Sequence, residues 1–293
     1  MRLTRFRNLF FVVVSVFSHL IIAYDSLEGF TQIECELRLK MRSSRKRNYD
    51  DFTVTEQTNS SAYASFTHPH FSVKESNSLN WSGYAALTNL TNPTPNSVTA
   101  VYGSWIVPKL SPSRRDTYCA VWVGMDGYSN NTVEEIGTEH DWHNGCQHNY
   151  AWFEMYPNAS YEIVGFPVNP GDVINASVVY TCNGVFVLTL VNETRKVYFV
   201  APTSETTSIE AQRSSAEWIV EAPYDNGILP LSHFNKIYFK NCTAMINNIH
   251  GPINEQFWQN DALTMVTTCG QVKAEPSRLT SHGQGFSVEW KHE

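Results

Sequence analysis

The chain has 293 residues, 42% hydrophobic and 13% aromatic, which is enough to bury one sizeable core or two modest ones. Its formal net charge of −7 is unevenly placed: residues 1–75 carry 10 Lys and Arg against 8 Asp and Glu, whereas residues 76–293 carry 11 against 20. The net negative charge of residues 76–293 argues against nucleic acid as a partner. It is compatible with activity at low pH, where protonation of carboxylates relieves their mutual repulsion.

The N-terminus has the layout of a secretory signal peptide. Three arginines within the first seven residues precede the mostly apolar run 9–22, and the small residue Ala23 follows. The run is short for a membrane span, and polar residues interrupt it. We therefore expect residues 1–23 to be removed, leaving a secreted, extracellular protein with no membrane partner; a retained signal anchor is the alternative.

Eight Asn-x-Ser/Thr triplets agree with secretion and indicate a glycosylated surface. They begin at Asn59, Asn80, Asn89, Asn130, Asn158, Asn175, Asn192 and Asn241. Asn80 and Asn241 are doubtful acceptors, because each is expected in a strand.

The chain has six cysteines, and in an oxidising compartment some of them should pair. They are Cys35, Cys119, Cys146, Cys182, Cys242 and Cys269. If Cys35 leaves with a pro-segment, one thiol is left over. Sequence alone does not give the pairing.

Residues 24–75 differ from the rest and predict a pro-segment or a disordered arm. Six basic residues fall within Arg38–Arg47, and polar sequence without clear periodicity follows. Either this positive charge covers an acidic cleft until it is removed, with Lys46-Arg47 as a processing site, or the segment is a solvated linker.

From residue 76 onward the pattern predicts one all-β domain, 76–293. The strand-like runs are Val98–Val107, Tyr118–Met125, Tyr150–Tyr156, Val173–Thr181, Val185–Val191, Lys196–Val200, Ser214–Glu221, Phe234–Phe239 and Leu263–Thr268. Turn residues separate them, and Asn183-Gly184 is a strong hairpin signal. Many short strands with evenly spread turns indicate an antiparallel sandwich or barrel.

One strand ends on a carboxylate. Ser214–Glu221 alternates, so that Glu217, Ile219 and Glu221 share one face, and Pro223 cannot continue the ladder. A carboxylate at the end of a rigid strand, beside a turn, is well placed for acid–base chemistry. Taken by itself, the same pattern also fits an ordinary Glu on a sheet surface.

Three further stretches place acids and indoles on one side. Tyr150–Tyr156 puts Trp152 and Glu154 on one face. Val121–Gly127 puts Trp122, Gly124 and Asp126 on one face. Thr132–His140 puts Glu135, Gly137 and Glu139 on one face, although Gly137 could shift the strand register. Pooled in one groove, crowded carboxylates would have raised pKa values and serve as proton donors or acceptors in acid. The alternative is that the aromatic residues fill the core and the acids face water.

Other catalytic and binding signatures are missing from the sequence. The segment from His140 to His148 holds three His, one Asp and one Cys, but its spacing matches no standard zinc cluster. There is no Gly-x-Ser-x-Gly and no phosphate loop. We therefore expect no cofactor and no metal.

Six blocks of sequence, in order and with sensible gaps, resemble the glutamic peptidases, or eqolisins. They are Asn80–Gly83, Gly103–Pro108, Trp122–Gly127, Ala151–Pro157, Gly171-Asp172 and Ser214–Glu221. The resemblance implies a sandwich of two bent antiparallel sheets with a substrate groove on one face. It also implies a secreted acid endopeptidase, made with a pro-segment, that uses a Glu–Gln dyad. The Glu falls on Glu221, which would activate a water as general base.

The chain departs from this pattern at the second dyad position. The family's Gln-x-Gly aligns with Glu135-Ile136-Gly137, so Glu135 stands where Gln is expected. A carboxylate cannot donate to an oxyanion, whereas a protonated carboxyl can. Either Glu135 stays protonated beside Glu221 and the chain is an acid-limited peptidase, or it keeps the fold and binds peptide or polysaccharide without turnover. A purely structural cell-surface sandwich is a third alternative.

The resemblance also implies supporting roles for six residues at the substrate site. Asp126 and Asp141 would hydrogen-bond near the dyad, and the groove would be lined by Trp81, Trp122, Trp152 and Glu154. The partners it implies are a protein or peptide substrate and the chain's own pro-segment, and the protein is expected to be a monomer.

Overall fold

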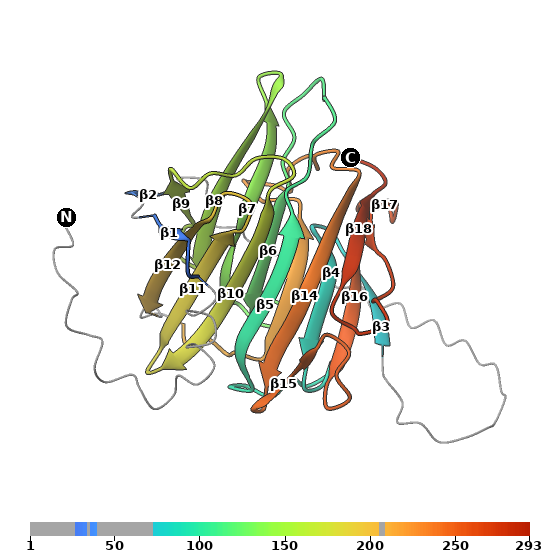
Figure 1. Ribbon diagram of the computed structural model, residues 1–293. Coiled ribbons are helices and arrows are strands. Elements are labelled where there is room, and N and C mark those ends of the chain that lie inside the picture. Colours follow the sequence, from blue (N-terminus) through green and yellow to red (C-terminus); the bar gives the residue numbers. More distant parts are fainter. Residues whose placement is uncertain (1–26, 34–35, 40–72, 205–208) are drawn as a thin grey trace.

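The structure, a computed structural model, describes residues 27–33, 36–39, 73–204 and 209–293, and throughout these it is built from strands and turns without a helix (Figure 1). The all-β prediction is therefore confirmed. The signal peptide, Cys35 and most of the basic run lie outside the described residues. Within 24–75, the described parts form two short strands and the start of a third.

The strands form two layers, and the first layer carries the candidate site. Its order is β3 (Val73–Ser78), β16 (Gln259–Val266), β4 (Trp81–Leu87), β13 (Ser215–Glu221), β6 (Ala120–Met125), β7 (Val133–His143), β8 (Cys146–Tyr156), β9 (Tyr161–Val164) and β2 (Glu36–Leu39). Every pairing in it is antiparallel except β3 with β16.

The second layer packs against the first. Its order is β18 (Phe286–Trp290) and β15 (Ile249–Pro252), both on β14 (Lys236–Ile246), then β5 (Val98–Ile106), β10 (Val173–Cys182), β11 (Val185–Asn192), β12 (Val197–Ser204) and β1 (Thr31–Gln32). The β1–β12 pairing is parallel, so the expectation of purely antiparallel sheets was wrong. Each parallel pair is made by a strand from the N-terminal part of the chain that adds beside a strand far away in sequence. β17 (Val272–Pro276) pairs with both β16 and β18 and joins the layers into one network.

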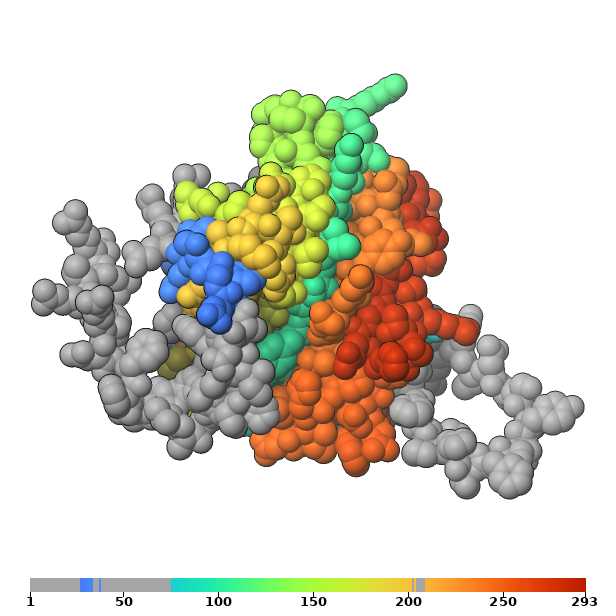
Figure 2. Space-filling model, viewed as in Figure 1, coloured from blue at the N-terminus to red at the C-terminus, as the bar shows by residue number. Residues whose placement is uncertain are grey.

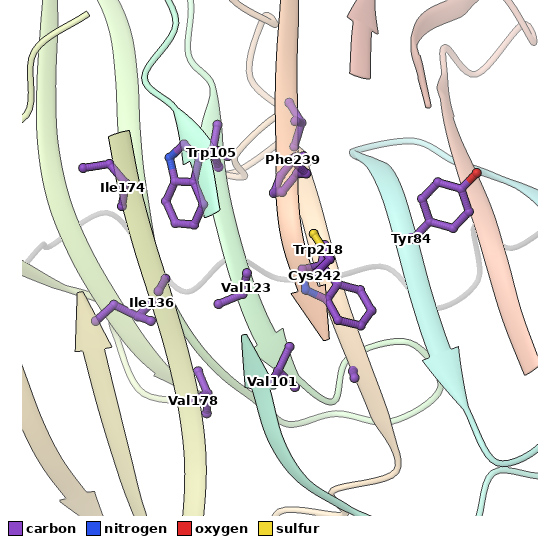
Figure 3. Packing of buried hydrophobic residues seen from close by; sticks show 14 of the residues in the cluster. Tyr84, Val101, Trp105, Val123, Ile136, Ile174, Val178, Trp218, Phe239 and Cys242 are labelled. Atoms are coloured by element: carbon purple, nitrogen blue, oxygen red, sulfur yellow. The ribbon is translucent and has the colours of Figure 1, made fainter. Parts of the chain in front are cut away.

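A large hydrophobic core fills the space between the layers (Figure 3). Ile136 and Val123 come from the first layer, and Ile174 and Phe239 come from the second; all four are essentially buried. Two indoles also bridge the layers. Trp105 Nε1 donates to Thr138 Oγ1 at 2.9 Å, and Trp218 Nε1 donates to the carbonyl of Tyr102 at 2.8 Å.

The predicted hairpin is confirmed, whereas several strands were not predicted. Asn183 and Gly184 have φ values of 51° and 72°, and they join β10 to β11 as the hairpin that the sequence predicts. β4, β9, β15, β17 and β18 were not anticipated, because they are short or rich in small residues; β14 extends seven residues beyond the predicted Phe239 to Ile246.

The expected disulfide pairing is not found: all five cysteines in the described residues are free. Cys119 and Cys242 are buried in the core, whereas Cys146, Cys182 and Cys269 are exposed near the turns after β7, β10 and β16. The exposed thiols lie on three different hairpins, and this separation explains why they do not meet.

Candidate functional site

One face of the first layer is acidic. The opposite face of these strands contributes to the large core, as in Val121, Val123 and Met125 of β6. The acidic face instead carries a separate, small apolar cluster that contains Trp81, Trp122, Trp152 and Ile219. Buried carboxylates from neighbouring strands lie among these side chains: Glu135 and Glu139 of β7, Glu154 of β8, and Glu217 and Glu221 of β13. We call this surface the acidic face.

Strand pairing arranges the acidic face in three rows that cross the sheet. The first row is Asp261, Ala85, Glu217, Gly124, Glu135 and Glu154. The middle row is Leu263, Gly83, Ile219, Trp122, Gly137 and Trp152. The third row is Trp81, Glu221, Ala120, Glu139 and Tyr150. Two rows of acids therefore lie on either side of a row of apolar and aromatic side chains.

Glu221 is the last residue of β13 and is fully buried. Its Oε2 accepts a hydrogen bond from Trp122 Nε1 at 2.9 Å, and its Oε1 accepts one from Asn80 Nδ2 at 3.3 Å. The strand ends here because Pro223 follows, and the preceding amide of Ala222 bonds to the carbonyl of Asn80. Two donors, one of them Trp122 of the middle row, thus hold the carboxylate in one orientation.

Cys119 reports on the charge around Glu221. Burial raises the pKa of this thiol well above its usual range, and the carboxylates of Glu139, Asp141 and Glu221 raise it further. An anion near Cys119 disfavours the thiolate only at short range. Strand pairing agrees with this for two of the three carboxylates, because Glu139 and Glu221 are both paired with Ala120, the first residue of β6.

Glu135 lies on the same face as Glu221, two strands away. The two residues occupy the first and third rows, with Trp122 in the row between them. The direct neighbour of Glu135 in its row is Gly124, where an added Cβ would lie 3.0 Å from the Cβ of Glu135 and 3.0 Å from Cζ3 of Trp122. The missing side chain at Gly124 therefore leaves room for Glu135, with Glu217 beyond it on β13.

Asp126 forms a clamp beside the rows rather than within them. It follows β6 with φ of 69°, and its carboxyl accepts from the backbone N–H groups of Arg213 and Ser214 and from the side chains of Asn130 and Thr132. Burial raises its pKa, while these hydrogen bonds act in the opposite direction. The clamp fixes the entry of the chain into β13, the strand that carries Glu221.

The remaining predicted site residues lie on the acidic face or along its edge. Asp141 is two residues beyond Glu139 on β7, opposite His148 of β8, and Glu154 is beside Glu135. The indoles of Trp81, Trp122 and Trp152 are at most 2% exposed, and Trp81 meets Trp122 edge-on at 5.0 Å between ring centroids. The prediction that they line an open groove remains a prediction.

Some residues of the face were not singled out from the sequence. Glu217 and Glu139 were visible on the predicted faces, but nothing local marks them as partners of Glu135 and Glu221. Tyr128, which donates to Asp261 at 2.6 Å, could not be found from sequence, because the two residues are brought together only by strand pairing.

Neither a metal-binding cluster nor a membrane-spanning helix is found among the described residues. Across these residues, no group of three or more His, Cys, Asp and Glu side chains has the arrangement of a metal site. In the same part of the chain, no helix is long and apolar enough to cross a membrane.

Comparison with known proteins agrees with the fold. The model of the Peptidase A4 family matches residues 79–275. Aspergillopepsin-2 of Aspergillus niger is 28% identical over 147 residues, which cover 49% of this chain and 50% of that protein. Scytalidopepsin B of Scytalidium lignicola is 33% identical over 100 residues, or 34% of this chain and 38% of that protein. The matched stretch thus spans half or less of these relatives.

Solved structures match over a longer stretch. Scytalido-glutamic peptidase with a transition state analog inhibitor matches with a TM-score of 0.61 and 23% identity, over 72% of this chain and 98% of that chain. Aspergilloglutamic peptidase from Aspergillus niger matches with a TM-score of 0.54 and 21% identity, over 60% and 99%. At this identity the structures support the fold alone. Because the family model covers well over half of the sequence, the chain belongs to the Peptidase A4 family, the eqolisins or glutamic peptidases.

Proposed function

We propose that this protein is an acid endopeptidase that hydrolyses peptide bonds with Glu221 as general base and protonated Glu135 as oxyanion donor. The observation that carries the proposal is the buried Glu221 carboxylate, held by Trp122 and Asn80 at a strand end, on the same face as Glu135. Membership of a peptidase family supports it. The floor of the substrate groove would be the acidic face, with Trp81, Trp152 and Glu154 at its sides.

The separation of the two acids suits a shared water. Two strand spacings and four residue rises put their Cα atoms about 16 Å apart in a flat sheet. Each extended Glu side chain reaches about 5 Å from its Cα, given bond lengths of about 1.5 Å. If both side chains incline toward each other over the middle row, the gap left between the carboxyl groups is about 6 Å, close to two hydrogen bonds of about 2.8 Å, and one water would then bridge them.

The proton balance of the reaction is simple. Glu221 takes a proton from the water as its oxygen attacks the carbonyl carbon of the substrate. The protonated Glu135 donates a hydrogen bond to the oxyanion that forms. Glu221 then returns the proton to the leaving amine, the C–N bond breaks, and a new carboxyl terminus and a new amine remain. Asp126 and Asp141 would support this geometry without touching the reacting atoms.

The first experiment is a pH series of peptide cleavage by the mature protein. Wild type is expected to cleave in acid and to lose activity as the pH rises toward neutrality, because Glu135 must carry a proton in order to donate to the oxyanion. Glu221→Gln should lower kcat by about 10³ or more, because the general base is lost. Glu210→Gln, at an exposed residue outside the strands, is the matched control. Cleavage that survives in Glu221→Gln would remove Glu221 from the mechanism.

The second experiment concerns the departure at Glu135. Glu135→Gln supplies an amide donor that needs no proton, so cleavage should extend to higher pH, with a gain of about tenfold near pH 5.5. The alternative function is a peptide- or polysaccharide-binding module. No cleavage at any pH by wild type or by Glu135→Gln, together with retained binding of a peptide or polysaccharide, would favour that alternative.

We also propose that the protein is secreted after removal of residues 1–23. The basic and apolar layout of this segment and the eight glycosylation triplets support this. Expression in a secretory host, followed by N-terminal sequencing and treatment with a glycan-removing enzyme, tests it. Recovery of an intracellular protein that retains Met1 and carries no glycan would refute it.

A further inference from the structure

Glu135 and Glu217 lie in one row of the acidic face, with a glycine between them. Glu135 of β7 and Glu217 of β13 are both paired with Gly124 of β6, and both are fully buried. Two strand spacings put their Cα atoms about 10 Å apart. Gly124 adds no side chain, and the Trp122 ring borders the space where its Cβ would be. In such a buried, apolar setting, charge on one carboxyl acts strongly on the other.

Glu135 is the most crowded acid of the first row. Glu154 is its direct neighbour on β8, and Glu217 follows beyond Gly124. The direct neighbours of Glu217 are Ala85 and Gly124, so its nearest acids in the row are two strands away on either side. Glu154 lies at the end of the row. With one proton among these buried acids, the closest pair of like charges is removed, and the others are spread furthest, when Glu135 holds it.

The far end of the row is arranged to carry a charge. Tyr128 donates to the carboxyl of Asp261 at 2.6 Å, and a donated hydrogen bond favours the charged form of a carboxyl. In the strand register, Asp261 is also paired with Lys74 of β3. Burial raises the pKa of Tyr128, and the charges of Asp261 and Glu217 raise it further. Negative charge is therefore held toward Asp261 and the proton toward Glu135.

The other charged groups around Glu135 do not neutralise the row. Glu139 and Glu221 lie in the third row, and Asp126 is held by its own donors after β6. From Asp261 to Glu154, the first row contains no Lys, Arg or His. The exposed lysines of β14 lie on the second layer, the side of the molecule that Figure 2 shows; they are Lys236 and Lys240.

We propose that Glu217 is a positioning residue for the proposed hydrolysis: its charge, acting across Gly124, keeps on Glu135 the proton that the oxyanion requires. Glu217 touches no reacting atom and transfers no proton, so its whole effect on the reaction passes through Glu135. The inference rests on the proposed function, and it adds the group that holds Glu135 in its donor form.

The first test follows the proton on Glu135 without turnover. The full chain carries Glu221→Gln, which prevents self-digestion, and glutamates labelled with ¹³C at the side-chain carboxyl. NMR follows the titration of each carboxyl, and the signal that is lost in Glu135→Gln identifies Glu135. Its titration midpoint should lie at least one pH unit above the value of about 4.3 for an isolated Glu. A midpoint near 4.3 would overturn the proposal, and this measurement needs no change at Glu217.

Variants of Glu217 in the same background test the cause. Glu217→Gln removes the charge and should lower the midpoint of Glu135 by about one pH unit. Glu217→Asp keeps the charge and should retain most of the raised midpoint. Glu210→Gln, at an exposed residue outside the strands, should leave the midpoint unchanged. An equal midpoint in Glu217→Gln and in the unchanged background would overturn the proposal.

The second test is the pH profile of cleavage with Glu221 intact. Glu217→Gln should lose cleavage about one pH unit below the unaltered chain, with kcat on the acid plateau unchanged within about twofold. A merely structural role would lower kcat at every pH. In a Glu135→Gln background the amide needs no proton, so adding Glu217→Gln should leave the profile as it is. An equal shift in both backgrounds would overturn the proposal.

The two tests separate this inference from the proposed function. Cleavage in acid together with an unchanged Glu135 midpoint in Glu217→Gln would remove Glu217 from the mechanism and leave the hydrolysis standing. No cleavage at any pH, together with a midpoint that falls in Glu217→Gln, would refute the hydrolysis and support the placement of the proton on Glu135 by Glu217.

Discussion

Protonation of the buried residue His140 should lower the free energy of unfolding in acid. His140 is fully buried on β7, with Nε2 at 2.9 Å from Thr138 Oγ1 and Nδ1 at 2.9 Å from Asn149 Oδ1. Trp105 of the second layer donates to the same Thr138 hydroxyl, so the imidazole belongs to a polar link between the layers. Burial lowers the pKa of His140 to about 4, although the hydrogen bond to Asn149 acts the other way.

The unfolded state therefore takes up a proton at this site before the folded state does. Stability that is present above pH 6.5 should be lost as the pH falls through 4, by about 3 kcal/mol in total. In His140→Gln, the loss of unfolding free energy between pH 7 and pH 4 should be smaller by about this amount. Urea unfolding at both pH values measures it, with the exposed His282→Gln as control. An equal pH dependence in both variants would disprove the assignment.

Asp126 has the opposite dependence on pH. Burial raises its folded pKa, so the cost of burying its charge is relieved as the pH falls. Asp126→Ala would leave the buried amides of Arg213 and Ser214 without their acceptor. We expect a loss of about 2–4 kcal/mol in unfolding free energy at pH 7. Glu210→Ala, at an exposed site, should change it by less than about 0.5 kcal/mol.

At the scale of single strands, β6 and β7 approach each other closely because Gly137 has no side chain. An added Cβ there would lie 2.3 Å from the carbonyl oxygen of Val121 and 2.6 Å from the Cβ of Trp122. Neither group can move without shifting β6, the strand that carries Trp122 toward Glu221. The glycine of the predicted Glu-x-Gly triplet is thus required by packing.

Gly137→Ala should destabilise the protein by about 3 kcal/mol, as overpacking against a backbone does. It should also disturb the environment of Trp122, visible as a change in indole fluorescence. Gly145→Ala is the control: its φ is 80° but its Cβ would meet nothing within 4 Å, so a loss of only about 1 kcal/mol is expected. Equal losses in the two variants would show that packing at Gly137 is not the cause.

Alternation within strands was the part of the site that sequence could predict. The faces of Ser214–Glu221 and of Thr132–His140 are those that the structure has, and β7 runs past Gly137 without the register shift that a glycine could introduce. Pairing between distant strands could not be predicted. That Glu135 shares its row with Glu217, and Glu221 with Glu139, depends on contacts across the sheet, which no local pattern encodes.

At the scale of the whole molecule, the described cysteines contribute no cross-links, so stability depends on the core between the layers. In a Cys35→Ser variant, reductant should leave the unfolding midpoint unchanged. A thiol reagent should label Cys146, Cys182 and Cys269 in the folded state, and Cys119 and Cys242 only after unfolding, because both are buried. Mass spectrometry of the labelled peptides measures this. A reductant-dependent increase in mass would reveal a disulfide instead.

The two faces of β6, β7 and β13 limit which insertions and deletions these strands can tolerate. Each strand alternates between core side chains and acidic-face side chains, so an insertion of one residue within it would turn the carboxylates into the core and the apolar residues outward. An insertion of two residues preserves which way each side chain points. Viable length variants within these strands should therefore come in even steps, and single-codon insertions or deletions should survive only in the turns.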